Sequence, residues 1–286
     1  YRGVGHRLRS VSRSGTISRR LLPALTGLLL FLQGALVVTG GAVRLTGSGL
    51  GCPTWPECTP GSYLPVEGQA EGALHAWIEF GNRLLTFALF LAAVATLIAV
   101  LRSGRRDLRF LAATQILGIL GQGVLGGITV LTDLNPLSVA SHFLLSTILI
   151  AAATSLHSRR RQPHVRTSST QVRISRVSFI HVISAFIAIA IGTLVTGTGP
   201  HAGDLDAPRL NFAITTITRF HSASVWILIL ISIYFYRSPD LRYETKRWLG
   251  IFFVIALMQG VIGYTQYFLG VPELLVAAHL LGSVLF

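Results

Sequence analysis

Gln122-Gly-Val-Leu-Gly126 and Gln259-Gly-Val-Ile-Gly263 are near-identical copies of one pentapeptide, and this repeat decides the fold of the chain. Each copy is followed, twenty residues after its Gln, by a histidine in an apolar segment, His142 in the first copy and His279 in the second. The chain therefore consists of two related halves. An imidazole surrounded by hydrocarbon is costly, so both histidines are predicted to be functional.

The composition is that of an integral membrane protein. Hydrophobic residues make up 51% of the 286 residues and charged residues only 12%, which excludes a disordered chain. A transmembrane helix needs roughly 20 apolar residues. Seven apolar runs reach this length, and an eighth has only 15 residues, so we expect the chain to stop inside its eighth span. The runs cover residues 21–43, 73–101, 108–131, 137–157, 175–197, 212–236, 247–269 and 272–286.

The distribution of arginine predicts the orientation of these spans. Basic residues cluster before the first span and in the connections after the second, fourth and sixth, whereas the other connections carry only Arg44 and Arg209. This alternation follows the positive-inside rule and predicts a cytoplasmic N-terminus. The external loops are then residues 41–72, 132–136, 198–211 and 270–272. The net charge of +13 indicates topology and contact with anionic membrane lipid rather than nucleic-acid binding.

The repeat extends through all four spans of each half. Leu36–Gly40 at the end of the first span matches Thr193–Gly197 in the fifth, and Asn82 in the second span matches His221 in the sixth. We predict an all-α integral membrane protein with eight transmembrane helices, arranged as two pseudo-symmetric four-helix bundles. Its parts are a basic cytoplasmic tail 1–20, an N-terminal bundle 21–157, a cytoplasmic linker 158–174 and a C-terminal bundle 175–286.

Cys52 and Cys58 are the only cysteines and lie in the predicted external loop, in Gly51-Cys-Pro-Thr-Trp-Pro-Glu-Cys58. Disulfides persist on the outer side of a membrane, and the two cysteines are spaced to close a small loop. A structural bridge and a labile, redox-active one both stay open. A metal site is disfavoured, because both the number and the spacing of the cysteines are wrong for it.

His221 and His279 predict a haem in the C-terminal half. A helix rises about 1.5 Å per residue, so both histidines lie about 10–14 Å below the outer surface. Histidines of matched depth on two helices of one bundle can each offer a nitrogen to one face of a haem. The alternative is a pair of structural histidines that are hydrogen-bonded to Gln259 or to hydroxyl groups.

The N-terminal half is chemically different. It keeps His142, but Asn82 takes the place of the second histidine, and an amide is a poor ligand for haem iron. An iron with an open position can bind oxygen or a substrate. Glu79 lies one turn from Asn82 on the same helix face, where a carboxylate can move protons.

Three arginines bear on this interpretation. A carboxylate within a span is usually functional, but Glu79 has an alternative role as the partner of Arg83 or Arg44 in a salt bridge. Arg83 and Arg219 are also intramembrane, and cations beside a haem are typical of propionate binding.

These features together resemble the haem A synthase family. The resemblance is carried by the loop Gly47-Ser-Gly-Leu-Gly-Cys-Pro-x-Trp-Pro-x-Cys58, by Ile78-Glu-Phe-Gly-Asn-Arg83, and by His142 and His279, and it runs from about residue 21 to the end. It is closest in type to bacterial, actinobacterial-like members with Asn in place of His in a Glu-x-x-His motif. The resemblance implies an eight-span, two-bundle oxidoreductase of the bacterial cell membrane. Such an enzyme oxidises the C8 methyl of haem O, through an alcohol, to the formyl of haem A for cytochrome c oxidase.

The resemblance also implies roles for individual residues and partners. It implies a haem b cofactor on His221 and His279, substrate haem O on His142 beside Asn82, a catalytic Glu79, and a disulfide between Cys52 and Cys58. Haem O synthase and an electron donor of unidentified nature are the implied partners, and homo-oligomerisation is left open.

Two other functions stay open at this point. A non-catalytic di-haem b-type electron-transfer subunit would carry low-spin haem in both halves, which Asn82 disfavours. A transporter with a parallel repeat would need broken helices and a polar site at the membrane midplane, whereas the polar residues here cluster near the outer face.

Overall fold

A computed structural model describes residues 13–160 and 169–285, with side chains described from 20 to 160 and from 176 to 285. Most of the predicted basic tail 1–20 and of the linker 158–174 lies outside the described side chains. Within the described residues the chain forms eight α-helices and one 3-10 turn. These are α1 (Arg13–Leu45), α2 (Ala73–Ser103), η1 (Arg106–Leu108), α3 (Arg109–Leu131), α4 (Pro136–Arg159), α5 (Ser169–Thr198), α6 (Ile214–Tyr236), α7 (Tyr243–Phe268) and α8 (Glu273–Leu285).

Seven of these helices are long and apolar enough to cross a membrane, and α8, with 13 residues, is shorter. Large apolar side chains such as Phe31, Phe87 and Leu117 point outward and are more than two-thirds exposed. In water such a surface would be costly, but hydrocarbon accepts it, and helices satisfy their own backbone groups there. The chain is therefore a multi-pass, all-α membrane protein, as the sequence predicts.

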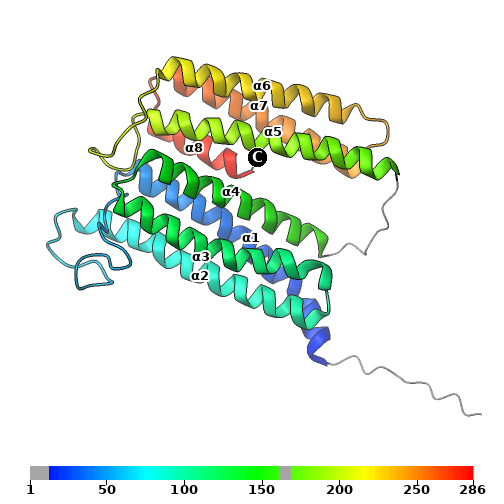
Figure 1. The fold of residues 1–286 in the computed structure, drawn as a ribbon, viewed down its shortest axis with the longest axis horizontal. Coiled ribbons are helices and arrows are strands. Elements are labelled where there is room, and N and C mark those ends of the chain that lie inside the picture. The colour runs from blue at the N-terminus through cyan, green and yellow to red at the C-terminus, as the bar shows by residue number, and fades with distance from the viewer. Residues whose placement is uncertain (1–12, 161–168, 286) are drawn as a thin grey trace, which may run out of the picture.

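The helices lie side by side and connect end to end (Figure 1). Among α1 to α4, each helix packs on its two neighbours, because α1 contacts α2, α2 contacts α3, α3 contacts α4, and α4 contacts α1. The second half forms an open series in which α5 contacts α6, α6 contacts α7, and α7 contacts α8. The two sets meet where α1 packs on α8 and α4 packs on α5. Helices α1 and α4 therefore form the boundary of the first half with the second.

The core of the first half contains buried amides as well as leucines. Leu29, Leu89 and Leu156 are almost completely buried between its helices. Gln33 on α1 donates from its side chain to Gln115 on α3 at 2.9 Å, and Gln115 donates in turn to the backbone oxygen of Leu149 at 3.1 Å. Because buried polar groups need partners, this chain of bonds fixes how α1, α3 and α4 face one another.

Helix α1 continues further than the sequence suggests. It ends at Leu45, so the connection from α1 to α2, predicted to be external and called the external loop below, begins at residue 46 rather than 41. Gly40 and Gly41 stay helical, because the absence of side chains at these positions gives room to neighbours on two sides. A Cβ at Gly40 would lie 3.7 Å from the side-chain nitrogen of Asn82, and one at Gly41 would collide with Leu280 of α8. Helix α5 likewise begins at Ser169, before the expected residue 175.

The external loops of the two halves form one cap at one end of the helices (Figure 1). The backbone N–H of Gly49 donates to the Gly203 oxygen at 2.9 Å. Arg44 donates to the backbone oxygens of His201 and Thr196, in the loop after α5 and in its last turn. The first contact joins the first of these loops to the third, and the second joins the last turn of α1 to α5 and its following loop, so the cap ties the halves together at this end.

Candidate functional site

The two histidines of the second half face each other. His221 on α6 and His279 on α8 have ring centroids 6.5 Å apart. A metal ion held at about 2 Å by one nitrogen of each ring would place the centroids about 6 Å apart, so this pair has the spacing for an iron between the rings. The residues present therefore fit a haem with two axial histidines.

Hydrogen bonding also leaves the correct nitrogens available. His221 Nδ1 lies 3.0 Å from the Ala188 oxygen of α5, and because a carbonyl only accepts, Nδ1 must be the donor. The other nitrogen, Nε2, then carries the lone pair that a metal requires, which is the usual arrangement around a ligating histidine. Within the described residues, His279 Nδ1 is buried without a partner. The alternative considered from the sequence is a hydrogen bond from Gln259 or from a hydroxyl group to these rings. For His221 the structure contains a hydrogen bond to the Ala188 carbonyl instead.

His142 of the first half occupies the equivalent position in space. A Cβ at Gly126 of α3 would lie 3.4 Å from His142 Cε1, and a Cβ at Gly263 of α7 would lie 3.4 Å from His279 Cε1. In both halves the repeated pentapeptide therefore supplies the glycine against which the histidine ring packs. His142 Nδ1 is, like that of His279, buried without a partner among the described residues.

Gln122 anchors the helix that carries His142. Its side-chain nitrogen donates to the His142 backbone oxygen at 3.0 Å and to Ser146 Oγ at 2.7 Å. The matching Gln259 instead lies against Gly282, where any Cβ would collide with its amide. The glutamine is thus repeated in the sequence, but its contacts differ between the halves.

Asn82 on α2 faces α1 and is already hydrogen-bonded. Thr39 Oγ1 donates to its side-chain oxygen at 2.6 Å, and Gly40 lies beside its nitrogen. His221 contacts a glycine of the preceding helix in the same manner, since a Cβ at Gly192 of α5 would lie 3.1 Å from the His221 ring. Asn82 is the residue that the sequence repeat aligns with His221, and its amide oxygen is occupied by Thr39.

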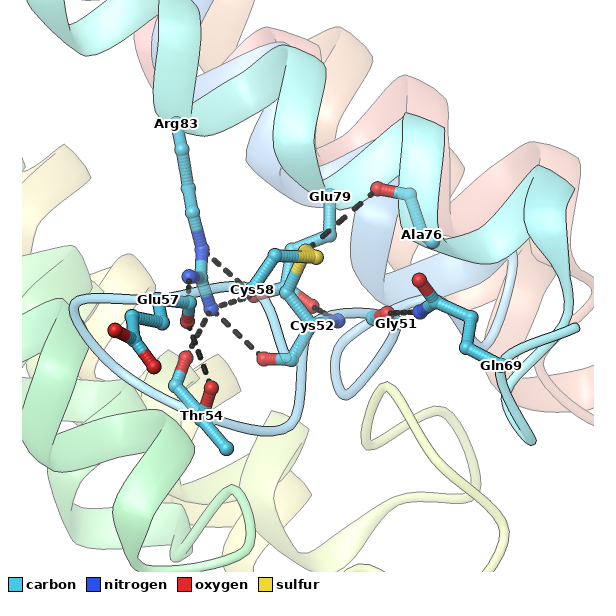
Figure 2. A network of polar contacts seen from close by, with 9 residues as sticks. All are labelled: Gly51, Cys52, Thr54, Glu57, Cys58, Gln69, Ala76, Glu79 and Arg83. Atoms are coloured by element: carbon cyan, nitrogen blue, oxygen red, sulfur yellow. Dashed lines mark hydrogen bonds and ion pairs between the residues drawn. A yellow bond between two sulfur atoms is a disulfide. The ribbon is translucent and has the colours of Figure 1, made fainter. Parts of the chain in front are cut away.

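Glu79 lies one turn before Asn82 and is bound to the external loop (Figure 2). Its side chain forms a salt bridge with Arg83 at 2.7 Å, and its second oxygen accepts the backbone N–H of Cys52 at 2.6 Å. Of the two salt-bridge partners considered from the sequence, the structure contains Arg83, while Arg44 binds loop carbonyls instead. Glu79 is 6% exposed, so the carboxylate of this ion pair is buried, while the Arg83 side chain is partly exposed.

Cys52 and Cys58 form a disulfide, which confirms the predicted pairing. Both cysteines are fully buried. Trp55 in this loop packs on Gly127, where a Cβ would lie 2.6 Å from the indole ring. Gly127 is next to Gly126, the glycine that contacts His142, so the disulfide loop packs on the same turn of α3 as this histidine.

Arg83 and Arg219, the two arginines predicted to bind haem propionates, lie in different surroundings. Arg83 points into the disulfide loop (Figure 2), and its N–H groups donate hydrogen bonds to Glu79 and to backbone carbonyls of that loop. Arg219 is exposed on α6, two residues before His221. His75, the histidine of α2, shares a hydrogen bond with Ser48 Oγ at 3.0 Å and is held by the loop that precedes α2.

Sequence reasoning missed several residues that shape the site. Thr39 binds Asn82, Ala188 orients His221, and Trp55 covers Gly127. Ala188 and Trp55 carry no motif that predicts their contacts. Thr39 had a signal, because it belongs to the Thr-Gly pair that recurs at Thr196-Gly197 in the fifth span.

Comparison with known proteins gives a consistent family. The model of the COX15-CtaA family, described as "Cytochrome oxidase assembly protein", matches residues 24–211. The curated "Heme A synthase" of Geobacillus thermodenitrificans is 33% identical over 114 residues, 39% of this chain and 34% of the relative. The "Heme A synthase" of Methylobacterium sp. (strain 4-46) is 27% identical over 237 residues, 69% of this chain and 65% of the relative.

A "Heme A synthase" of Sinorhizobium fredii matches over a longer stretch, with 23% identity over 324 residues, 93% of this chain and 87% of the relative. The chain spans about a third of the length of the Geobacillus relative and just under two thirds of that from Methylobacterium. The family model alone covers more than half of the chain, including Glu79 and His142. The chain therefore belongs to the COX15-CtaA family of cytochrome oxidase assembly proteins, the haem A synthase family.

Proposed function

We propose that this protein is a haem A synthase, which converts the C8 methyl of haem O to the formyl of haem A in two successive oxidations during cytochrome c oxidase biogenesis. The observation that carries the proposal is the facing pair His221 and His279, with ring centroids 6.5 Å apart on α6 and α8. Family membership and the names of the relatives point to the same activity.

In this proposal the second half is the cofactor half. His221 and His279 hold haem b, which supplies one-electron transfer when bound. The Ala188 carbonyl keeps Nδ1 of His221 protonated and thereby presents Nε2 to the iron. Gly192 and Gly263 leave room for the two imidazole rings, so the ligands are held in place by packing as well as by hydrogen bonds.

The first half is the substrate half. His142 binds the iron of haem O, and Asn82, bonded to Thr39, leaves the opposite position without a strong ligand. One histidine holds the substrate more weakly than two would, which favours release of the product. Glu79 is the catalytic residue, because it is the carboxylate within the spans of this half and can accept protons as the methyl carbon is oxidised.

We further propose that α1 to α4 and α5 to α8 are two four-helix bundles, that α8 is the eighth span, and that the N-terminus is cytoplasmic in a bacterial cell membrane. The ring of contacts among α1 to α4 favours the first bundle, and the facing rings of His221 on α6 and His279 on α8 favour the second. The loops 46–72 and 199–213 lie at the same end of the helices, opposite the basic connection that includes Arg105 and Arg106 (Figure 1). Haem O synthase would deliver the substrate, and a membrane electron donor would supply reducing equivalents.

Haem analysis of the purified protein tests this function. We expect haem B together with haem A or its alcohol precursor after extraction and chromatography, and a low-spin signal in the reduced-minus-oxidised spectrum. Haem B alone would contradict the synthase and support a di-haem electron-transfer subunit. A protein without any haem would contradict both and support a transporter.

A further inference from the structure

We propose that Arg83 is a positioning residue, which holds the Glu79 carboxylate against the backbone of the loop closed by Cys52 and Cys58. This loop, residues 52–58, is then a wall of the catalytic site and not only an external cover. The inference rests on the proposed function in one respect, namely that Glu79 acts on the substrate.

Arg83 binds the helix and the loop at the same time (Figure 2). Its Nε and Nη2 donate to Glu79 Oε1 at 3.1 and 2.7 Å. Its Nη1 donates to the Glu57 oxygen at 3.1 Å, and Nη2 also donates to the oxygens of Cys52 and Thr54 at 2.8 and 3.1 Å. Three backbone carbonyls of one seven-residue loop therefore converge on a single guanidinium.

Glu79 is bound to the same loop through its second oxygen. Cys52 donates its backbone N–H to Glu79 Oε2 at 2.6 Å, while the Cys52 carbonyl accepts from Arg83. The Glu79–Arg83 pair thus binds both backbone polar groups of Cys52, its N–H and its C=O, and both carboxylate oxygens of Glu79 are engaged. Charge-assisted bonds of this kind are strong when shielded from water, so the carboxylate has one preferred orientation.

A helical salt bridge alone does not explain this arrangement. An exposed Glu–Arg pair four residues apart contributes only about 0.2–0.5 kcal/mol and needs no third partner. Here the disulfide holds the backbone carbonyls of Cys52, Thr54 and Glu57 close together. The planar guanidinium of Arg83 has several N–H groups, which reach these carbonyls and Glu79 at the same time. A lysine has a single nitrogen and reaches fewer of these acceptors. The extra contacts fix where Glu79 points, which is the requirement for a group that must meet a substrate carbon.

The proposal changes the role of Arg83. From the sequence, Arg83 is a candidate ligand for a haem propionate, but its donors are directed at Glu79 and the loop. A propionate ligand would affect binding of the substrate. A positioning residue affects the turnover of bound substrate, so kcat and KM for haem O distinguish the two roles.

The first measurement does not depend on catalysis. We would follow reduction of the Cys52–Cys58 disulfide in the purified full chain by a water-soluble phosphine, with thiol labelling and mass spectrometry. Arg83→Leu should raise the rate of disulfide reduction about tenfold or more, because it removes the guanidinium that binds the loop. Arg83→Lys should raise the rate less, and Glu79→Gln should raise it measurably, because each of these changes loosens the loop to a smaller degree. The matched control is Arg209→Leu, since Arg209 also donates to loop carbonyls, at Ala207 and Pro200, but contacts no carboxylate among the described residues. It should leave the rate unchanged.

The second measurement is conversion of haem O by the same variants. We expect Arg83→Leu to lower kcat about 100-fold with KM unchanged, as for a catalytic group displaced by about 1 Å. Arg83→Lys should restore part of the loss. In a Glu79→Asp background, in which the shorter carboxylate no longer reaches both the guanidinium and the loop, Arg83→Leu should have little further effect on kcat, because Arg83 acts through Glu79.

The two measurements separately test the clamp on the loop and the positioning role of Arg83. An Arg83→Leu protein that keeps wild-type reduction kinetics would overturn the clamp. A rise in KM with normal kcat, or an additive loss in the double variant, would show that Arg83 contacts substrate directly and would overturn the positioning role. If the wild-type protein converts no haem O while the reduction rates follow the expected order, the proposed function fails and the clamp stands. Retention of the low-spin haem spectrum in every variant controls for folding.

Discussion

The two halves of the molecule share a repeated plan of helices and differ in the side chains beside the repeated histidine. Each places a histidine, His142 or His279, against a glycine of the helix before it. In the second half a histidine of α6 faces that ligand, and in the first half the matching residue of α2 is Asn82, which is bound by Thr39. The first half also has Glu79, for which the second half has no matching carboxylate. In our proposal this difference separates the roles of the halves: the half with two facing histidines transfers electrons, and the half with one histidine and a buried carboxylate carries out the reaction.

The largest effect is expected from Glu79→Gln, which removes the carboxylate that only the first half has. Conversion of haem O should be abolished, because the amide cannot accept a proton, while the low-spin spectrum of the second half should stay intact. Product analysis by chromatography and the reduced-minus-oxidised spectrum measure the two effects. Glu67→Gln is the control, since Glu67 is an exposed glutamate of the same external loop. Full activity of the Glu79 variant would remove this residue from the mechanism.

His221→Asn would make the second half resemble the first. We expect loss of the low-spin signal and of most of the haem B, because asparagine is a poor ligand and only His279 would be left. The haem B content per protein, measured after extraction, provides the readout. Unchanged low-spin haem B would mean that His221 is not an axial ligand.

Asn82→His is the reverse exchange and should make the first half resemble the second. A second imidazole opposite His142 would bind the iron of the substrate more tightly and close its open position. We expect turnover to fall several-fold, about 1 kcal/mol or more in the barrier, and more haem to be retained after purification. Steady-state kinetics and haem stoichiometry check this. Faster turnover would contradict the role assigned to weak ligation.

Thr39→Val should have the smallest effect. It removes the hydroxyl that donates to the Asn82 oxygen at 2.6 Å and leaves that amide without this partner. We expect a loss of about 1 kcal/mol in stability, measured as a lower midpoint of thermal unfolding in detergent. Thr39→Ser, which keeps the hydroxyl, should behave as the wild type. Equal destabilisation by both changes would point to packing against α2 rather than to the hydrogen bond.

Much of this comparison can be predicted from the sequence, because it depends on periodic or repeated features. Apolar runs long enough to cross a bilayer predict the seven long helices, and the repeat predicts that His142 and His279 are equivalent. The disulfide follows from two cysteines in one external loop. These features are local or duplicated, so a single chain displays them.

The rest depends on how loops and helices meet, which no local pattern records. The sequence leaves Glu79 with two possible arginine partners, and the path of the disulfide loop places Arg83 there. Arg44 instead donates to two backbone carbonyls of the other half, one in the last turn of α5 and one in the loop that follows α5. The continuation of α1 to Leu45 depends on Gly40 and Gly41, whose neighbours lie on α2 and α8. Such contacts join residues distant in sequence and require the folded structure.

The central claim is that the second half holds the cofactor and the first half holds the substrate. Extraction and chromatography of the haem bound to His142→Ala and His279→Ala, each supplied with haem O, tests it most directly. The account predicts that His142→Ala retains haem B and lacks haem O and haem A, and that His279→Ala loses haem B and still binds haem O. Loss of haem B from His142→Ala with retention in His279→Ala, or equal haem B in both, would contradict the division of labour between the halves.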